Sequence, residues 1–345
     1  MEIRNHYIDG DRIKKIVTEA NIEYIKKPDI NSHNSVEEVL LNGIRGFLKK
    51  SVDGNGKSIP TLDKYEYLVS KMSELYGLKT AQEFLVYDQD GVSLFSKSVV
   101  SGNEKLIMAS GLTFELLRQL KIPEEMIQEL KEKGVSAIND LIIKYNLSQE
   151  TVKSLKELSD KVTDYNKGIQ KFREGLERKE DGPNVDRFYV KDHDQMEFAI
   201  YIFINKLDML NLDNKEEIVR DYIRMCYFDA LIGNKDRNPN NYGLVRKEDG
   251  SYTFAPLFDS ATISMPTTDD NLWQINEYLI DREATLKYLE AKYPNYVNDL
   301  KNLDVSEIMT TMSLDVLDKE EFEKFNKLVL NNLSRKPSKD QAMDK

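Results

Sequence analysis

The chain has 345 residues, 40% of them hydrophobic and 32% charged, and a formal net charge of −11. This length predicts about two domains or lobes with a substantial core, and no apolar run approaches the ~20 residues of a membrane span. The negative charge argues against broad binding to phosphate backbones, so no direct nucleic-acid partner is expected. Because Cys226 is the only cysteine and there are three histidines, a disulfide framework and a zinc or cysteine-rich centre are excluded.

The N-terminal residues carry early charges and lack the apolar segment and the cleavage site of a secretory signal. A cytoplasmic location is therefore expected. Export as an effector, by a route that needs no signal peptide, is compatible with the same residues.

Residues 1–100 predict a small α/β unit. Strand-like runs are expected at residues 43–50, 84–87 and 92–100, the last two joined by a hairpin turn at 88–91. One helix lies between the first and the second of these runs and ends near Gly77. Its apolar positions recur at helical spacing: Tyr65, Leu68, Val69, Met72 and Leu75.

Residues 101–333 predict a mainly helical region. The helices rich in Leu, Glu and Lys are expected at residues 105–120, 123–133, 137–145 and 148–179. Two apolar helices follow, and the second ends at Gly233. A short hairpin and further helices complete the region, and the polar tail 334–345 is expected to be disordered. The fold class is thus α+β, with a small α/β lobe and a larger mainly helical lobe.

The stretch from Gly233 to Gly243 reads GNKDRNPNNYG and is followed by APLFD at residues 255–259. A buried helix, an Asp- and Asn-rich loop and a hairpin that returns another Asp can bring several oxygen ligands together, which suits Mg²⁺. Phosphoryl transfer needs an Asp near the attacking hydroxyl, an Asn five positions on that holds metal, and a second metal-binding Asp. Asp236, Asn241 and Asp259 fit these roles. A solvated loop is the alternative interpretation, since turns use the same residue types.

This stretch resembles the signature of the HipA-like serine/threonine kinases, a G-N-x-D-R-H-x-x-N-x-G loop followed by a P-x-x-D segment. The resemblance implies a two-lobed protein-kinase-like fold that uses ATP and Mg²⁺ to phosphorylate a protein hydroxyl, autophosphorylation included. It makes Asp236 the catalytic aspartate, Asn241 the metal-binding asparagine and Asp259 the aspartate of the kinase D-F-G. Asn238 departs from the pattern, because many members have His there. The resemblance is close over residues 225–264 and looser before residue 100, and a toxin–antitoxin role does not follow.

The family also implies a phosphate-facing turn, a strand lysine and a helix glutamate near the N-terminus. Gly43 and Gly46 resemble that turn, which runs into a strand ending at Lys49 and Lys50, and Glu66 lies in the helix that follows. The lysine would contact the α- and β-phosphates while Glu66 holds its ammonium. Lys49 is preferred, but only one of the two lysines can point inward and alternation alone leaves the register open. Two solvated lysines at a strand end are the alternative.

Three weaker signals favour structural interpretations. Residues 51–58, SVDGNGKS, nearly match a P-loop but lack its first glycine, and Pro60 disfavours a helix starting at residue 57. His193 lies between two aspartates near a helix start, where capping explains it. Cys226 lies in an apolar helix, where it serves as a small core residue.

Two other functions remain open. One is a nucleotide-binding pseudokinase that acts as an interaction module. The other is transfer to a phosphoinositide or small molecule, because lipid kinases share a D-R-H-x-x-N-like loop. A protein substrate and ATP are the expected partners of the main hypothesis.

Overall fold

The computed structural model describes residues 1–10, 12–26, 34–52, 55, 57–89, 91–133, 137–174, 193–210, 212–234, 237, 239–260, 282–330 and 333. The chain forms two compact units: the first is Met1–Gly102, Asp221–Tyr242 and Ala255–Lys345, and the second is Asn103–Arg220 and Gly243–Phe254. This grouping differs from the predicted lobes, because two later stretches join the N-terminal hundred residues by contact and not by chain order. The predicted tail 334–345 lies outside the described residues.

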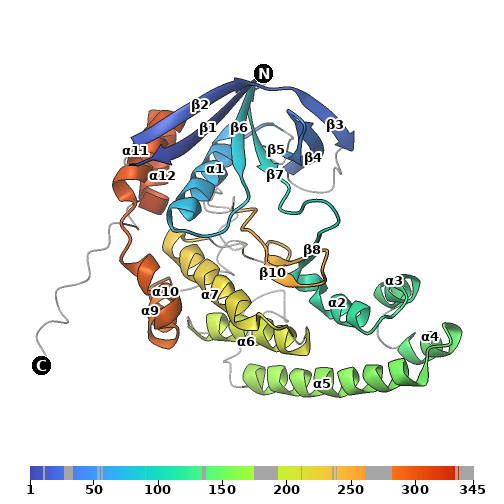
Figure 1. Ribbon diagram of the computed structural model, residues 1–345. Coiled ribbons are helices and arrows are strands. Elements are labelled where there is room, and N and C mark those ends of the chain that lie inside the picture. The colour runs from blue at the N-terminus through green and yellow to red at the C-terminus, as the bar shows by residue number, and fades with distance from the viewer. Residues whose placement is uncertain are drawn as a thin grey trace, which may run out of the picture. The chain divides into compact units, whose positions relative to one another are not determined.

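The first unit contains a seven-stranded antiparallel sheet in the order β2-β1-β6-β7-β5-β4-β3 (Figure 1). Its strands are β1 (Glu2–Asp9), β2 (Arg12–Glu19), β3 (Ile22–Lys26), β4 (Asn34–Leu41), β5 (Ile44–Ser51), β6 (Glu83–Asp88) and β7 (Gly91–Lys97). The apolar runs of β6 and β7 are buried because these strands are central in the sheet. The edge strand β2 is exposed almost throughout and carries charges, which discourage edge-to-edge pairing.

The two edge strands β2 and β3 follow one another in the chain. Only Ala20 and Asn21 connect them, and the three peptide steps from Glu19 to Ile22 span at most about 11 Å. The sheet must therefore curl until its edges approach each other at this end. Asn42, in the turn between β4 and β5, ties the same end through a backbone N–H that donates to the Asn21 carbonyl at 2.8 Å.

Helix α1 (Pro60–Leu75) packs against β5, β6 and β7. Pro60 at its first position suits the helix start, and Gly77 with a φ of 66° follows its end. Leu68, Val69 and Met72 are completely buried, which stabilises the unit by about 1.5–3 kcal/mol for each side chain. Truncation of Met72 to alanine would cost about 2–5 kcal/mol.

The sheet buries a separate apolar cluster on its other face. Lys49, Leu94 and Leu85 are register partners, and Lys49 contacts α1, so these residues mark the face toward the helix. The neighbouring positions point the opposite way because side chains alternate along a strand. That face is filled by Ile3, Val39, Leu41, Leu48, Val86 and Phe95.

Helices complete the first unit on its C-terminal side. They are the second half of α7 (Lys215–Ile232), α9 (Arg282–Lys292), α10 (Pro294–Lys301), α11 (Ser306–Val316), α12 (Lys319–Phe325) and the π-helical turn η6 (Asn326–Leu330). Arg224 of α7 holds α10 through Nη1, which donates to both carboxylate oxygens of Asp299 at 2.7 Å and to the Tyr296 carbonyl at 3.1 Å. Gly233, with a φ of 72°, lets the chain leave α7.

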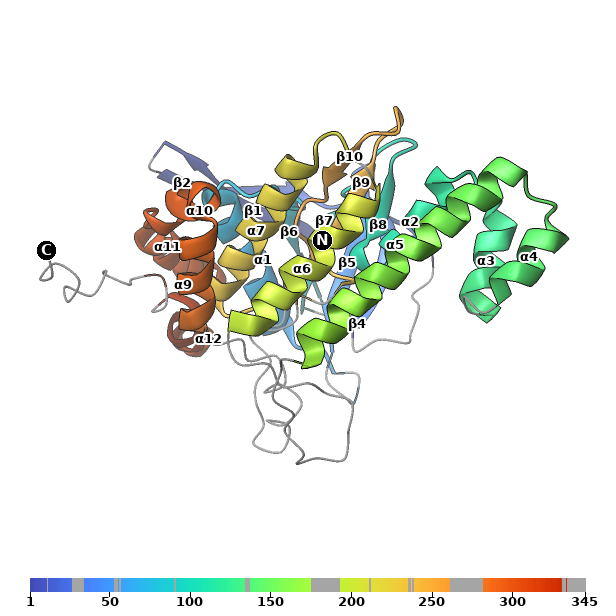
Figure 2. The same cartoon turned by 90° about the horizontal axis from the view of Figure 1, so that it is seen from below.

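The second unit is mainly helical. Its elements are β8 (Lys105–Met108), η1 (Ala109–Gly111), α2 (Leu112–Gln119), α3 (Glu124–Lys133), α4 (Ile138–Lys144), α5 (Gln149–Glu174), α6 (His193–Leu210), β9 (Gly243–Arg246) and β10 (Tyr252–Phe254). The strands form a sheet in the order β10-β9-β8, and α5 runs beside α6 (Figure 2). No helix in the described ranges has the length and apolar character that a bilayer crossing requires.

Candidate active site

Lys49 and Glu66 form a buried ion pair between β5 and α1. The Lys49 Nζ donates to Glu66 Oε2 at 2.7 Å, and the two residues are 8% and 3% exposed. Alternation along β5 turns Lys50 to the opposite face, which resolves the register that the sequence left open. Burial alone would lower the pKa of the Lys49 ammonium, but the carboxylates of Glu66 and Asp259 outweigh it and raise that pKa, so the side chain stays charged.

Asp259 supplies a second carboxylate to the same ammonium. Lys49 Nζ donates to Asp259 Oδ1 at 2.8 Å, although the two residues are 210 positions apart. The Asp259 backbone has a φ of 53°, a left-handed conformation that non-glycine residues seldom adopt. Such strain of about 1–3 kcal/mol concentrates at functional sites. The side chain is 44% exposed, so this carboxylate is open to an incoming ligand.

Arg237 joins the loop that carries Asn241 to the segment that carries Asp259. Its Nη1 donates to the Asn241 carbonyl at 3.0 Å and to the Phe258 carbonyl at 2.8 Å. Its Nη2 also reaches Ser260 Oγ at 3.1 Å. Because one nitrogen binds carbonyls from both segments, the backbone of Asn241 and that of Phe258, the residue before Asp259, are held next to each other.

Asp229 of α7 anchors this arginine. It accepts from Arg237 Nε at 2.8 Å and from Nη2 at 2.9 Å, a bidentate pair that is almost entirely buried. Asn234 Nδ2 donates to the same carboxylate at 2.8 Å, just past the end of α7. Sequence reasoning missed Asp229 and Arg237. Asp229 could have been noticed in the sequence, because it is an acid within the apolar half of a helix. A carboxylate buried there needs a partner of opposite charge.

Asp63 fastens α1 to β5 beside the ion pair. It is fully buried and accepts from the Ser51 hydroxyl at 2.7 Å and from the Ser51 backbone N–H at 3.2 Å. Asp63 lies three residues before Glu66, so both carboxylates face the same strand. Burial raises the pKa of Asp63 to about 7, and the Glu66 charge adds to this rise. Ser51, the first residue of the near match to a P-loop, therefore has a structural partner.

The two glycines predicted to bind nucleotide lie elsewhere. Gly43 has a φ of 78° in the turn between β4 and β5, and Lys49 lies about 20 Å farther along the strand. Gly46 lies within β5, where an added Cβ would approach the Phe95 ring to 2.4 Å. Its missing side chain makes room for Phe95. Neither glycine lies beside the Lys49 ammonium, and a role of this turn toward phosphate stays a prediction.

The remaining predicted residues are placed as follows. Asn241 is buried, and Lys50 is half-buried beside Lys49. Asp236 and Asn238 lie outside the described residues. Cys226 is a free, buried thiol, and burial raises its pKa, which fits the predicted core position.

The donor set is compatible with magnesium. Among the described residues, no group of three or more His, Cys, Asp or Glu side chains gathers as a metal-binding cluster. Mg²⁺ needs fewer protein ligands, because one or two carboxylates suffice when phosphate oxygens and water complete its shell. The Asp259 carboxylate and the nearby Asn241 segment offer oxygen donors of that kind, and Lys49 offers a charge for phosphates.

Comparison with solved structures finds 21 similar chains, among them a kinase and a chain of a toxin–antitoxin complex. The Helicobacter pylori proinflammatory kinase CtkA has a TM-score of 0.49 and 12% identity, covering 91% of this chain and 95% of that one. A chain of the Shewanella oneidensis MR-1 toxin–antitoxin complex of HipA, HipB and operator DNA has a TM-score of 0.44 and 10% identity over 90% of this chain. This chain spans 65% of that second chain. No protein-family model and no curated protein matches the sequence.

The chain's own contacts define the fold type. An antiparallel sheet, a helix packed on it and a strand lysine paired with a glutamate of that helix are features of protein kinases. The described residues therefore have the α+β, kinase-like fold that the sequence predicted.

Proposed function

We propose that the chain is an ATP- and Mg²⁺-dependent serine/threonine protein kinase of HipA-like type. The observation that carries the proposal is the single ammonium of Lys49, bonded to a helix glutamate and to the aspartate of the P-x-x-D segment. In protein kinases, a lysine held in this way by Glu contacts the nucleotide phosphates, and the aspartate binds the metal. The left-handed backbone at Asp259 supports the same assignment.

Each residue of the site has a distinct proposed role. Lys49 would donate to the α- and β-phosphates while Glu66 keeps its ammonium in position. Asp259 and Asn241 would hold Mg²⁺, which supplies positive charge against the phosphate oxygens when it is bound. Arg237 would keep the two metal-binding segments together, because it bonds to both of their backbones. The Arg237 guanidinium is itself held in place by its ion pair with Asp229.

Asp236 would orient the attacking serine or threonine hydroxyl. As the hydroxyl oxygen bonds to the γ-phosphorus, the bond from that phosphorus to the ADP oxygen breaks, and the Asp236 carboxylate accepts the hydroxyl proton. The protein side of this reaction consists of positioning and electrostatic stabilisation.

Labelled ATP tests the proposal. The purified chain with MgCl₂ and γ-labelled ATP is offered itself, peptides that contain serine or threonine, and phosphoinositide vesicles. We expect label on serine or threonine of protein, and we expect Asp236→Ala to abolish it while the thermal melt stays nearly unchanged. Full labelling by this variant would remove Asp236 from its role. Label found only on lipid would point to a phosphoinositide kinase, and Mg²⁺-dependent ATP binding without turnover to a pseudokinase.

A further inference from the structure

Helix α1 is held from a second direction by the C-terminal helices. Glu321, in the first turn of α12, accepts from Thr61 Oγ1 and from Lys64 Nζ, each at 2.7 Å. The Lys64 and Glu321 side chains are only 15% and 13% exposed, so this pair is more shielded than a surface salt bridge. About 260 residues of chain separate the two partners, and the contact is therefore a long-range constraint on α1.

An aromatic contact reinforces this attachment. The Tyr65 hydroxyl donates to the backbone carbonyl of Glu321 at 2.7 Å. The Tyr65 and Phe325 rings are tilted, with centroids 5.0 Å apart, and both residues are buried. Aromatic pairs of this geometry add to the stabilisation from burial. The first turns of α1 therefore pack directly onto α12.

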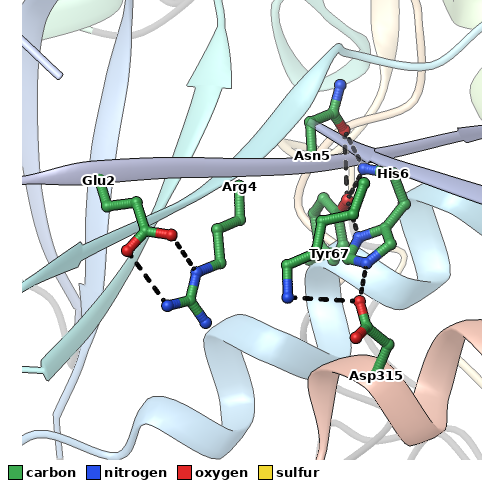
Figure 3. A network of polar contacts seen from close by, with 7 residues as sticks. Glu2, Arg4, Asn5, His6, Tyr67 and Asp315 are labelled. Atoms are coloured by element: carbon green, nitrogen blue, oxygen red, sulfur yellow. Dashed lines mark hydrogen bonds and ion pairs between the residues drawn. The ribbon is translucent and has the colours of Figure 1, made fainter. Parts of the chain in front are cut away.

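The helix that precedes α12 in the chain, α11, is linked to α1 through His6 of β1. Figure 3 shows the His6 ring between Tyr67 of α1 and Asp315 of α11, with a contact to each. The His6 backbone N–H donates to the Tyr67 hydroxyl at 2.6 Å, and His6 Nδ1 lies 2.9 Å from the same oxygen. His6 and Tyr67 are buried, and this bridge gives the Tyr67 hydroxyl the hydrogen-bond partner that a buried polar group needs.

The two side-chain contacts to Glu321 lie on the other side of α1 from the active-site pair. Successive helix residues are rotated by about 100°, so Lys64 and Glu66 point in nearly opposite directions. Lys64 faces α12, whereas Glu66 faces Lys49 on β5. Asp63 binds Ser51 on the same strand. Helix α1 is therefore fixed between the sheet and the C-terminal helices, and its rotation or withdrawal would break contacts on both sides.

We propose that residues 306–330 are a clamp, here called the C-terminal clamp, that holds α1 so that Glu66 meets Lys49. Glu321 is its principal positioning residue, because one carboxylate binds two side chains of α1. This inference rests on the proposed function, since the pair that it aligns is the proposed phosphate-binding pair. If the clamp acts in this way, phosphoryl transfer depends on the Glu321 carboxylate, which contacts neither the nucleotide nor the substrate.

The decisive variant is Glu321→Ala in the full-length chain. When the Glu321 carboxylate is removed, α1 loses two of its hydrogen bonds to α12. The backbone amides of residues 61–75 should then exchange with solvent about tenfold faster. The kcat for phosphoryl transfer should fall about tenfold, with a smaller change in KM for the protein substrate. The Glu321 carboxylate also accepts from the Asp318 backbone N–H and so completes the capping box of α12. Glu321→Gln should recover part of both effects, because its amide oxygen can still accept from Thr61 and Gln also serves in a capping box.

Two matched controls separate clamping from helix stability. Asp318 caps α12 by accepting from the Glu321 backbone N–H, so Asp318→Ala weakens α12 and leaves the carboxylate on α1. Glu320→Ala removes an exposed acid of the same turn that pairs with Lys324. Both controls should keep the exchange of α1 and the kcat within about twofold of the unaltered chain. If Asp318→Ala reproduces the full effect, general weakening of α12 explains it and Glu321 is not a positioning residue.

Exchange is measured without nucleotide, so it does not depend on the proposed activity. Exchange of α1 in Glu321→Ala equal to that of the Glu320→Ala control would overturn the clamp. If the original chain transfers phosphate and Glu321→Ala does so with the same kcat, the clamp is overturned as well. A parent chain that transfers phosphate to nothing counts against the proposed function alone, and the exchange result still decides the clamp.

Discussion

Two buried glutamates, Glu66 in the first unit and Glu115 in the second, differ in the charge balance of their surroundings. Glu115 is completely buried and accepts from Arg246 and the Tyr252 hydroxyl at 2.7 Å and from Arg118 at 3.1 Å. Two guanidinium groups surround this carboxylate, and Arg118 also pairs with the exposed Glu124, so two carboxylates and two cations balance one another within the chain. Glu66 shares one ammonium with Asp259, and there two carboxylates meet a single cation.

A buried charge that is balanced within the chain is structural, whereas a buried charge that is not balanced can bind a ligand. A saturated network such as that of Glu115 stabilises a unique packing and leaves no capacity for binding. A site with more carboxylate than cation, with one carboxylate half-exposed on a strained backbone, is poised to receive positive charge from outside. A divalent cation carried by a nucleotide would restore the balance at Lys49. We therefore expect changes near Glu66 to alter activity and changes near Glu115 to alter stability.

The largest expected effect is that of Lys49→Met. Without the ammonium, phosphoryl transfer should fall by about a hundredfold or more, because a preorganised charge toward the phosphates is lost. Turnover of labelled ATP measures this effect. The matched change in the second unit is Arg246→Met, which should leave turnover within about threefold and lower the free energy of unfolding by about 1–3 kcal/mol. Equal loss of turnover in both variants would contradict the division of roles.

A smaller effect is expected in the pH dependence of stability. The pKa of Asp63 is raised to about 7 by burial, above its value in the unfolded chain, so the native state binds this proton more tightly. Its contribution is fully present below the unfolded pKa of about 3.9 and is lost as the pH rises through 7. Urea unfolding between pH 5 and pH 8.5 should therefore show a decline on the order of 2–4 kcal/mol.

Asp63→Asn provides the control for that decline. Its amide oxygen can still accept from Ser51, and it carries no proton to lose in this range. The stability of this variant should vary less with pH than that of the unaltered chain. A decline of the same size in both proteins would assign it to other groups and remove Asp63 as its source.

The sequence predicted the active-site parts that lie in strongly patterned segments. Helix α1 was expected because its apolar residues follow a helical period, and β6 and β7 because central strands are apolar throughout. Strands β1 to β4 were not predicted. Strand β2 is an edge strand exposed on nearly every side, so it has no burial pattern for a sequence to show.

Other features depend on partners far away in the chain. In the sequence, nothing distinguishes Arg237 from other loop arginines. Its contacts to Asp229 and to two backbone carbonyls arise from tertiary packing. The packing role of Gly46 could not be predicted, because a glycine that makes room for a phosphate and one that makes room for the Phe95 ring share the same sequence signal. Glu321 acts on Thr61 from 260 positions away, and no local pattern could indicate that contact.

The smallest effect is expected for Lys50→Met, the neighbour of Lys49 on β5. Alternation turns Lys50 away from Glu66 and Asp259, so it adds no charge to the carboxylate-rich side of the sheet. Its replacement should change the free energy of unfolding by less than about 0.5 kcal/mol and turnover by less than about twofold. The same labelled-ATP and urea measurements apply. If Lys50→Met loses turnover as fully as Lys49→Met does, the lysine that meets the nucleotide is the other one, and the imbalance of charge at Glu66 loses its functional meaning.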